Sequence, residues 1–125
     1  MLPKSQRLRE RREFDITYRL KQSVSNEYIV LYVGKKKHND LKPTKTGFVV
    51  GKKVDKRSTR RNRIKRLLRE AFKNALKKGE LEYAKSCYSI IFLARQSCLN
   101  ATYEQVYSAV VDCVIRAGRK FKNDK

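Results

Sequence analysis

The sequence predicts an α+β fold, a two-layer α/β sandwich in which helices pack on one small sheet. Three observations support this prediction. Residues 64–76 carry apolar side chains at helical spacing, residues 28–33 are β-branched and aromatic, and residues 87–94 are almost continuously apolar. The length of 125 residues corresponds to one domain. We therefore expect a single domain over the whole chain, with flexible basic tails at residues 1–7 and 119–125.

The first helix is expected at Glu10–Lys21 (ERREFDITYRLK). Phe14 and Tyr18 are four residues apart and lie on one face of this helix. Ile16 and Leu20 form a second pair on nearly the opposite side. We therefore expect a helix that is apolar on two sides, with one side toward the core and the other toward a groove.

Two strands are expected next, at residues 28–33 and 46–53, with a Lys-rich loop between them that we expect to be mobile. A hairpin is the simplest pairing of these two strands. The polar stretch at residues 23–26 has room for a further short strand. Alternate side chains of a strand share a face, which groups Tyr28, Val30 and Tyr32 in the first strand and Val49, Gly51 and Lys53 in the second.

A long amphipathic helix follows the second strand. Ser58 or Thr59 can cap its beginning, and Gly79 stands where a glycine often ends a helix. Its buried stripe consists of Ile64, Leu67, Leu68, Ala71, Phe72, Ala75 and Leu76.

The last strand and the last helix complete the fold. The run at Cys87–Ala94 is typical of a strand that is covered on both faces. Asn100 or Thr102 can cap the final helix, and Thr102 with Gln105 forms a potential capping box. We expect this helix to end at Gly118. Its buried stripe consists of Val106, Ala109, Val110, Cys113, Val114 and Ala117. The element order is therefore α-β-β-α-β-α.

Charge indicates the class of partner. The chain has 32 Lys and Arg against 12 Asp and Glu, a formal net charge of +20. Lys and Arg dominate residues 52–69, where Asp55 is the only acid. An ordinary solvated helix face mixes Lys with Glu, so this excess favours a nucleic-acid partner over a merely solvated face. A membrane partner is not expected, because no apolar run is long enough to span a bilayer and the N-terminus lacks the apolar segment of a secretory signal.

Metal binding and protein-based catalysis are not expected. Cys87, Cys98 and Cys113 are widely spaced, and His38 is the only histidine, which argues against a zinc site. We interpret the cysteines as reduced residues of a cytoplasmic protein, with Cys87 and Cys113 in the core. The acids are scattered along the chain, and His38 has no evident catalytic partner. We therefore expect no catalytic residues, no metal site and no cofactor bound by the protein alone.

The segment RRNRIKRLLREAF at residues 60–72 closely resembles the RNR signature of the bacterial ribonuclease P protein subunit. Shorter pieces also resemble that family, and the resemblance covers about residues 8–115. They are EFDITY at 13–18, VLYV at 30–33, GKK at 51–53, and IIFLAR at 90–95 followed by Tyr103 and Glu104. Two positions depart from the family pattern: Gly51 replaces a small hydroxyl residue, and Ser89 replaces an aspartate.

The resemblance implies a fold of the ribosomal-protein-S5-domain-2-like type, α-β-β-β-α-β-α with a four-stranded sheet and a left-handed crossover. The additional strand would lie at residues 23–26. The general handedness rule predicts a right-handed crossover, so this feature follows from the resemblance alone.

The resemblance also implies a function, the Mg-dependent removal of the 5′ leader from precursor tRNA. In this family the protein is the accessory subunit, and the catalytic centre with its Mg²⁺ ions belongs to the RNA subunit. The implied partners are the ribonuclease P RNA, with one protein per RNA, and precursor tRNA. A ribosomal or other structural RNA-binding protein of similar fold is the main alternative. A DNA-binding module is disfavoured because no helix-turn-helix spacing or zinc signature is present.

Two RNA-binding surfaces follow from the resemblance and the residue chemistry. The residues expected to bind the RNA subunit are Lys53, Arg61, Asn62, Arg63, Lys65, Arg66 and Arg69. The residues expected to line a cleft for the single-stranded leader are Phe14, Tyr18, Val30, Tyr32, Val49 and Gly51. For Asn62 a local helix cap is as good an interpretation as a base contact. For Phe14 and Tyr18 the alternative is an ordinary core role, which full burial of the rings would indicate. Tyr28, Phe48, Phe72 and Phe92 are expected in the core.

Overall fold

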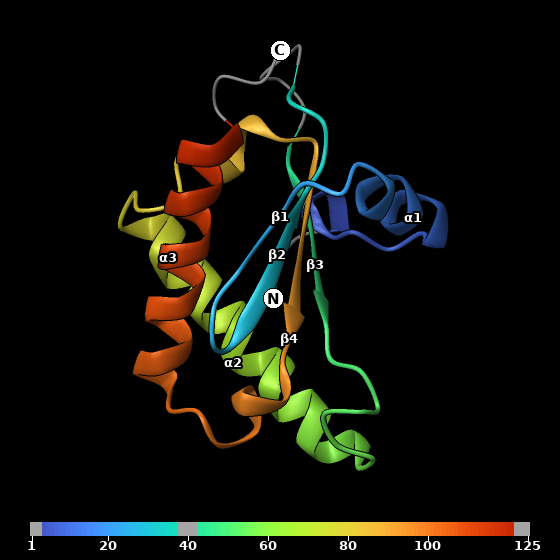
Figure 1. Ribbon diagram of the computed structural model, residues 1–125, viewed down its shortest axis with the longest axis vertical. Coiled ribbons are helices and arrows are strands. Elements are labelled where there is room, and N and C mark those ends of the chain that lie inside the picture. The colour runs from blue at the N-terminus through green and yellow to red at the C-terminus, as the bar shows by residue number, and fades with distance from the viewer. Residues whose placement is uncertain (1–3, 38–42, 122–125) are drawn as a thin grey trace.

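The computed structural model describes residues 4–37 and 43–121. In chain order, the elements follow the predicted α-β-β-β-α-β-α arrangement, with short 3₁₀ turns added (Figure 1). Their bounds are η1 Lys4–Gln6, α1 Arg11–Arg19, β1 Ser23–Ser25, β2 Ile29–Val33, β3 Lys45–Val49, α2 Ser58–Lys77, η2 Tyr83–Ser86, β4 Ser89–Ala94, η3 Gln96–Asn100 and α3 Tyr103–Phe121. The short strand expected at residues 23–26 is confirmed as β1.

The sheet order is β1-β2-β4-β3. β2 pairs antiparallel with both β1 and β4, and β3 pairs parallel with β4. The predicted hairpin between β2 and β3 is therefore wrong, because β4 lies between them. β4 is the most apolar strand, and a central position gives it a paired strand on each side and cover on both faces.

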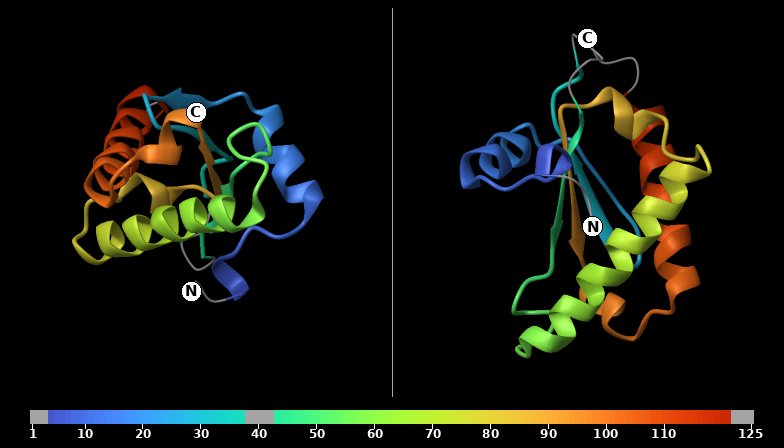
Figure 2. Two further views of the ribbon diagram at one scale, coloured as in Figure 1. Left: turned by 90° about the horizontal axis from the view of Figure 1, so that it is seen from below. Right: turned by 180° about the vertical axis from the view of Figure 1, so that it is seen from behind.

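The connection from β3 through α2 to β4 is a left-handed crossover (Figures 1 and 2). The helix layer consists of α2 and α3 on one face of the sheet, and α1 lies against part of the other face (Figures 1 and 2). This asymmetry leaves a portion of the second face without a helix.

The core lies between the sheet and the α2–α3 layer. Phe48, Phe72 and Phe92 form its aromatic centre, with ring centroids 5.5 to 5.8 Å apart. Phe72 and Phe92 are buried, and Phe48 and Tyr28 pack against the core while remaining partly exposed. The predicted stripes of α2 and α3 both face this core, with Leu67 and Leu76 partly buried at its border.

Only the N-terminal end of α2 differs from the prediction. Neither Ser58 nor Thr59 caps the helix, which begins after Arg57 without a side-chain cap. Instead, the Asp55 carboxylate accepts a hydrogen bond from the backbone N–H of Arg57 at 2.8 Å. Gly79 ends the helix as predicted, with a positive φ of 72°, a conformation that favours glycine.

The predicted capping box of α3 is confirmed, with Thr102 N–H donating to Gln105 Oε1 at 2.9 Å and Gln105 N–H donating to Thr102 Oγ1 at 3.2 Å. The predicted end at Gly118 is wrong, because α3 continues to Phe121, whose side chain is buried. Burial of an aromatic ring outweighs the modest cost of a glycine inside a helix.

The segment expected to be a flexible N-terminal tail is partly structured. Residues 4–6 form η1, and Arg7 forms a parallel bridge with Thr46. Leu8 is buried, and its N–H donates to the carbonyl of Thr46 at 3.0 Å. Residues 1–3 and 122–125, and His38 in the predicted mobile loop, lie outside the described residues.

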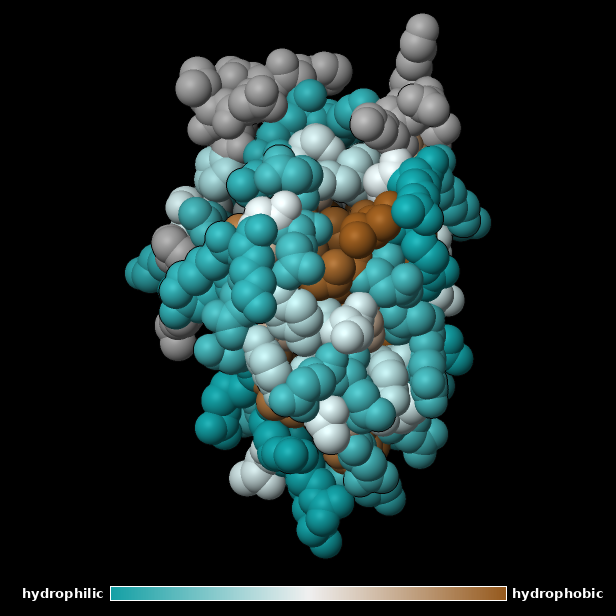
Figure 3. Space-filling model, turned by 90° about the vertical axis from the view of Figure 1, so that its left-hand side faces the viewer, coloured by the Kyte–Doolittle hydropathy of each residue, from teal (hydrophilic) through white to brown (hydrophobic). Residues whose placement is uncertain are grey.

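The three cysteines are free and buried, as predicted for Cys87 and Cys113. Burial raises the pKa of each thiol, to about 11 for Cys98 and Cys113. Protonated, buried thiols are poor nucleophiles. Among the described helices, none has the length and apolar character required to cross a membrane. The outer face of α2 and α3 is mainly hydrophilic, with a larger hydrophobic area in the upper part of the view and smaller ones below it (Figure 3).

Candidate RNA-binding surfaces

The basic surface is built on α2 and the turn before it. The stripe of α2 that faces the core holds Ile64 and Leu68, both at most 1% exposed. The remaining sides of the helix therefore point away from the core. Six of the seven residues predicted to bind an RNA subunit lie on these sides, and Lys53 is exposed in the preceding turn. The basic surface thus consists of Lys53, Arg61, Asn62, Arg63, Lys65, Arg66 and Arg69, all exposed or half-buried.

Asp55 is the acid nearest to the start of this helix. Its carboxylate lies 3.4 Å from Arg60 Nη1, while its backbone carbonyl accepts a hydrogen bond from Arg61 Nη1 at 3.2 Å. Arg61 has five N–H donors, so most of its guanidinium is left for another partner. Arg63 and Arg66 are exposed and form no ion pair with the described residues.

Asn62 is exposed, and its side chain forms no hydrogen bond within the described part of the chain. The interpretation of Asn62 as a local helix cap is therefore wrong. Its amide remains available as both a donor and an acceptor.

The second surface, the aromatic face, lies on the side of the sheet that carries α1. Cross-strand partners share a face of a sheet, and the register arranges the aromatic face in three rows. The row under the start of β4 contains Lys45 and Ser89, the next contains Gly47, Ile91 and Tyr32, and the last contains Val49, Leu93 and Val30.

Burial distinguishes the two faces of the sheet. Ile29, Leu31 and Val33 of β2 point into the core and are at most 1% exposed. Val30 and Tyr32, between them, are half-buried. The aromatic face therefore combines apolar side chains with access to solvent.

α1 contributes the two predicted aromatic rings. The centroids of Phe14 and Tyr18 are 6.4 Å apart, and Tyr18 meets Tyr32 edge-on at 4.8 Å. Phe14 lies directly over Gly47, where a Cβ atom would stand 2.8 Å from the Phe14 ring. Both α1 rings are half-buried, so they are not ordinary core residues.

The other apolar side of α1 faces away from the sheet. Ile16 is 48% exposed and Leu20 is 36% exposed. The prediction that this helix is apolar on two sides is therefore confirmed.

Two hydroxyl groups hold α1 on the sheet, and neither role is predicted by the sequence. Among the described residues of α1, Thr17 alone is fully buried. Its hydroxyl lies 2.9 Å from the carbonyl of Glu13 and 2.6 Å from Ser89 Oγ at the start of β4. Gly34 leaves room for Ser89, since a Cβ there would stand 2.2 Å from Ser89 Oγ.

An ion pair supports the same end of α1, with Lys45 Nζ 2.7 Å from Glu13 Oε2. The first row, with Lys45 and Ser89, therefore anchors α1 by polar contacts. The second row lies under the aromatic rings of α1. The residues of the third row form no hydrogen bond or ion pair with described side chains of α1.

Tyr18 is uncharged at neutral pH. Its partial burial, and secondarily the neighbouring Tyr32, raise the pKa of its phenol above the usual value of 10.0. A neutral aromatic ring can approach a polyanion without charge repulsion.

Gly51 lies beyond the end of β3, in a turn where its carbonyl accepts a hydrogen bond from the N–H of Val54 at 3.0 Å. A Cβ at Gly51 would meet only the Lys53 backbone nitrogen, at 4.0 Å. It therefore lies between the aromatic face and the start of the basic surface, and its lack of a side chain is not enforced by packing.

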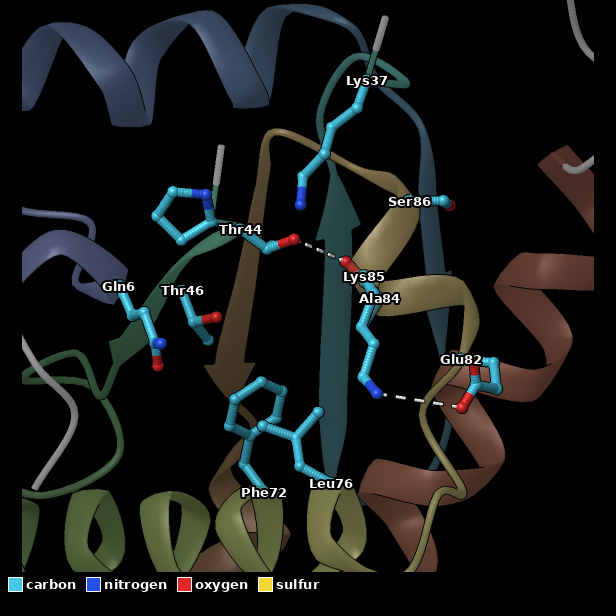
Figure 4. A pocket seen from close by; sticks show the side chains of 11 residues that line it. Gln6, Lys37, Thr44, Thr46, Phe72, Leu76, Glu82, Ala84, Lys85 and Ser86 are labelled. Carbon is cyan, nitrogen blue, oxygen red and sulfur yellow. Dashed lines mark hydrogen bonds and ion pairs between the residues drawn. The ribbon is translucent and has the colours of Figure 1, made fainter. Parts of the chain in front are cut away.

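A separate pocket of about 640 Å³ lies between α2, η2 and β3, where sequence analysis predicted no site (Figure 4). Phe72 and Leu76 form its apolar floor. Thr44 Oγ1 at its rim lies within hydrogen-bonding distance of the carbonyls of Ala84 and Cys87. Glu82, the acid of the lining, lies 3.8 Å from Lys85. The lining thus lacks the paired carboxylates that metal-dependent hydrolysis uses.

Together, the fold and the two surfaces define a small, basic RNA-binding protein. Comparison with known proteins narrows this class. The family model described as Ribonuclease P matches residues 2–121, and the chain belongs to this family, as a bacterial ribonuclease P protein component.

Individual relatives agree with this assignment. The Ribonuclease P protein component of Clostridium botulinum (strain 657) is 36% identical over 115 residues, covering 92% of this chain and 96% of the relative. That of Alkaliphilus oremlandii is 35% identical over 105 residues, covering 84% of each chain. The structure of the Staphylococcus aureus RNase P protein superposes with a TM-score of 0.74 at 29% identity, covering 91% of this chain and 96% of that chain.

The family assignment decides between the two functions considered from sequence. The chain is a subunit of an endoribonuclease that processes tRNA, and it associates with ribonuclease P RNA and tRNA substrate. The structural RNA-binding alternative loses its support, since these relatives share the name over nearly their full length.

Proposed function

We propose that the two surfaces divide the work of this subunit. The basic surface of α2 binds the folded RNA subunit, and the aromatic face binds the single-stranded 5′ leader of precursor tRNA. The observation that carries this proposal is the half-buried state of Phe14, Tyr18, Val30 and Tyr32, together with a basic surface whose Arg63 and Arg66 form no ion pair with the described residues.

The chemistry of the basic surface suits a folded RNA. Arg63 and Arg66 can each bind a phosphate through two parallel N–H donors, which a lysine cannot do. The helix is held by its buried stripe, so binding requires little ordering of the backbone. Asn62, which has no partner in the described chain, can bind a base edge or a 2′-hydroxyl from the same helix.

The chemistry of the aromatic face suits a single strand. Single-stranded binding sites place bases against aromatic rings and accept any sequence, because every base has a π-face. Tyr18 and Tyr32 meet edge-on on this face, and both are half-buried, so each keeps part of its surface accessible to solvent.

The catalytic centre, in this proposal, belongs to the RNA subunit. No three His, Cys, Asp or Glu side chains gather at one place among the described residues. Hydrolysis of a phosphodiester by two metal ions needs such a cluster. Mg²⁺ would act through the RNA, with one protein per RNA, in the cytoplasm where precursor tRNA is processed.

Reconstitution tests the proposal. The purified chain, a ribonuclease P RNA and a precursor tRNA are combined at low Mg²⁺, and 5′ cleavage is measured. We expect cleavage by the complex and none by the chain alone. Sustained 5′ maturation by RNA-free protein, after removal of contaminating nucleases, would contradict the assignment of the catalytic centre to the RNA.

A further inference from the structure

The third row of the aromatic face continues across the sheet to a cationic groove. Ser25 of β1 is the register partner of Val30, and Ser23 is the partner of Tyr32. β1 is an edge strand of the sheet. A groove of about 620 Å³ lies at this edge, between β1 and the last turns of α3. We call it the β1-edge groove, and its lining residues are Ser23, Val24, Ser25, Arg116, Arg119 and Lys120.

Two of the cations in this groove bind the free edge of β1. Arg116 Nη2 donates to the carbonyl of Ser25 at 2.6 Å, and Lys120 Nζ donates to the carbonyl of Ser23 at 3.4 Å. These bonds protect the edge from pairing with another strand. They also bring both positive charges to the border of the aromatic face.

The groove keeps an excess of positive charge. Asp112 lies 3.0 Å from Arg116 and neutralises that guanidinium in part. Arg119 is exposed and forms no ion pair within the part of the chain that the structure describes. The hydroxyls of Ser23 and Ser25 likewise form no hydrogen bond with described residues. Free hydroxyls beside cations match the chemistry of a phosphodiester.

We propose that the 5′ leader crosses the sheet along the third row, from the α2 side toward β1, and that the β1-edge groove binds the backbone phosphates of its distal nucleotides. The recognised group is a phosphodiester of single-stranded RNA. This inference rests on the proposed function, because it extends the path of the leader beyond the aromatic face.

The width of the sheet sets the length of leader that reaches the groove. Three strand spacings of about 4.8 Å make the floor about 14 Å wide. At about 3.4 Å per stacked nucleotide, about four nucleotides cross this distance. A shorter leader therefore ends on the aromatic face, and a longer leader enters the β1-edge groove.

The test measures the affinity of the assembled complex for precursor tRNAs with two leader lengths. One leader has about three nucleotides and the other about eight, on either side of the crossing length. The variants are Arg119→Gln and Lys120→Gln, which remove charge and keep side-chain length. Lys77→Gln is the matched control, since Lys77 is an exposed cation in the last turn of α2, away from the groove.

We expect each groove variant to lower the affinity for the long leader by about 4-fold at 0.15 M salt, the effect of one lost phosphate contact on a single strand. The affinity for the short leader and the behaviour of Lys77→Gln should match the unmodified protein. Equal losses for both leaders, or no loss for the long leader, would overturn the inference.

Tyr18→Ala, measured in the same assay, separates this inference from the proposed function. If Tyr18→Ala weakens leader binding and the groove variants do not, the path across β1 is wrong and the aromatic face stands. If Tyr18→Ala leaves both leaders unaffected, the leader site itself is wrong.

Discussion

The proposed function assigns RNA-binding side chains to both α2 and α1, but the two helices are anchored in the fold in different ways. α2 spans 20 residues and buries a stripe of five side chains in the core, while its cations stand on the other sides. α1 spans nine residues and buries one side chain, Thr17. Its aromatic rings, Phe14 and Tyr18, are themselves part of its packing on the sheet.

The difference teaches how closely binding is tied to folding in each region. On α2 the residues that stabilise the fold and those that we propose bind RNA are separate sets. On α1 the two sets overlap, since a ring that stacks on a base also packs on Gly47 or Tyr32. Substitutions should therefore separate binding from stability on α2 and combine them on α1.

The largest expected effect is on stability. Leu68 is 0% exposed, and Leu68→Ala should lower the free energy of unfolding by about 2–5 kcal/mol through lost burial and a new cavity. Arg66→Ala, two residues earlier and exposed, should change it by less than about 0.5 kcal/mol. Urea unfolding of both variants measures the comparison. Similar losses of unfolding free energy in the two variants would show that α2 does not keep its stabilising residues separate from its basic residues.

The next effect is on leader binding. Tyr18→Ala should weaken the binding of precursor tRNA by about 5- to 150-fold, the range for one lost base–aromatic stack. Mature tRNA, which has no leader, should bind as before. Tyr107→Ala is the matched control, because Tyr107 lies on α3 behind the opposite face of the sheet. Circular dichroism must show that Tyr18→Ala is folded, and an unfolded variant would instead support a core role for the ring.

A smaller effect is expected on assembly with the RNA subunit. Arg61→Ala, Arg63→Ala and Arg66→Ala should each lower the slope of log affinity against log salt by about one unit per lost phosphate contact. Lys85→Ala removes the same charge from η2 and should leave the slope unchanged. Filter binding over a salt series provides the measurement, and an unchanged slope in all three arginine variants would refute the role of the basic surface.

The smallest effect concerns the position of α1. Ser89→Ala removes one of the two partners of the Thr17 hydroxyl, and a buried hydrogen bond contributes about 0.5–1.5 kcal/mol. Ser86→Ala also removes a hydrogen bond, 2.6 Å from the carbonyl of Tyr83, but this bond lies within η2 and does not involve α1. Both variants should lose stability, and only Ser89→Ala should weaken leader binding. Equal leader binding by the two variants would mean that the Thr17–Ser89 contact does not position α1.

Much of the fold could be predicted from local patterns. The stripes of α2 and α3, the capping box at Thr102 and the turn at Gly79 each depend on residues that are close in sequence. The structure confirms all of them. One local prediction failed, because Asp55 and not Ser58 or Thr59 accepts a hydrogen bond at the start of α2. The other predictions that failed depend on distant contacts. The β2–β3 hairpin is replaced by pairing with β4, and the end of α3 is set by the burial of Phe121 and not by Gly118.

The same distinction applies to the site. The basic surface could be read from charge alone, because its residues are close in sequence. The contact between Thr17 and Ser89 joins residues 72 positions apart, and no local pattern indicates it. A threonine between two aromatic residues of a helix was the available signal, and it becomes informative once the sheet register is known.

The central claim is that the two surfaces act separately. A double-mutant cycle with Tyr18→Ala and Arg66→Ala tests it most directly, with RNA-subunit affinity and leader-dependent tRNA affinity measured for all four proteins. We expect Tyr18→Ala to change only the second affinity and Arg66→Ala only the first, with the double variant additive within about 0.5 kcal/mol. Loss of both affinities in each single variant, or a coupling energy above about 1 kcal/mol, would contradict the separation of the two surfaces.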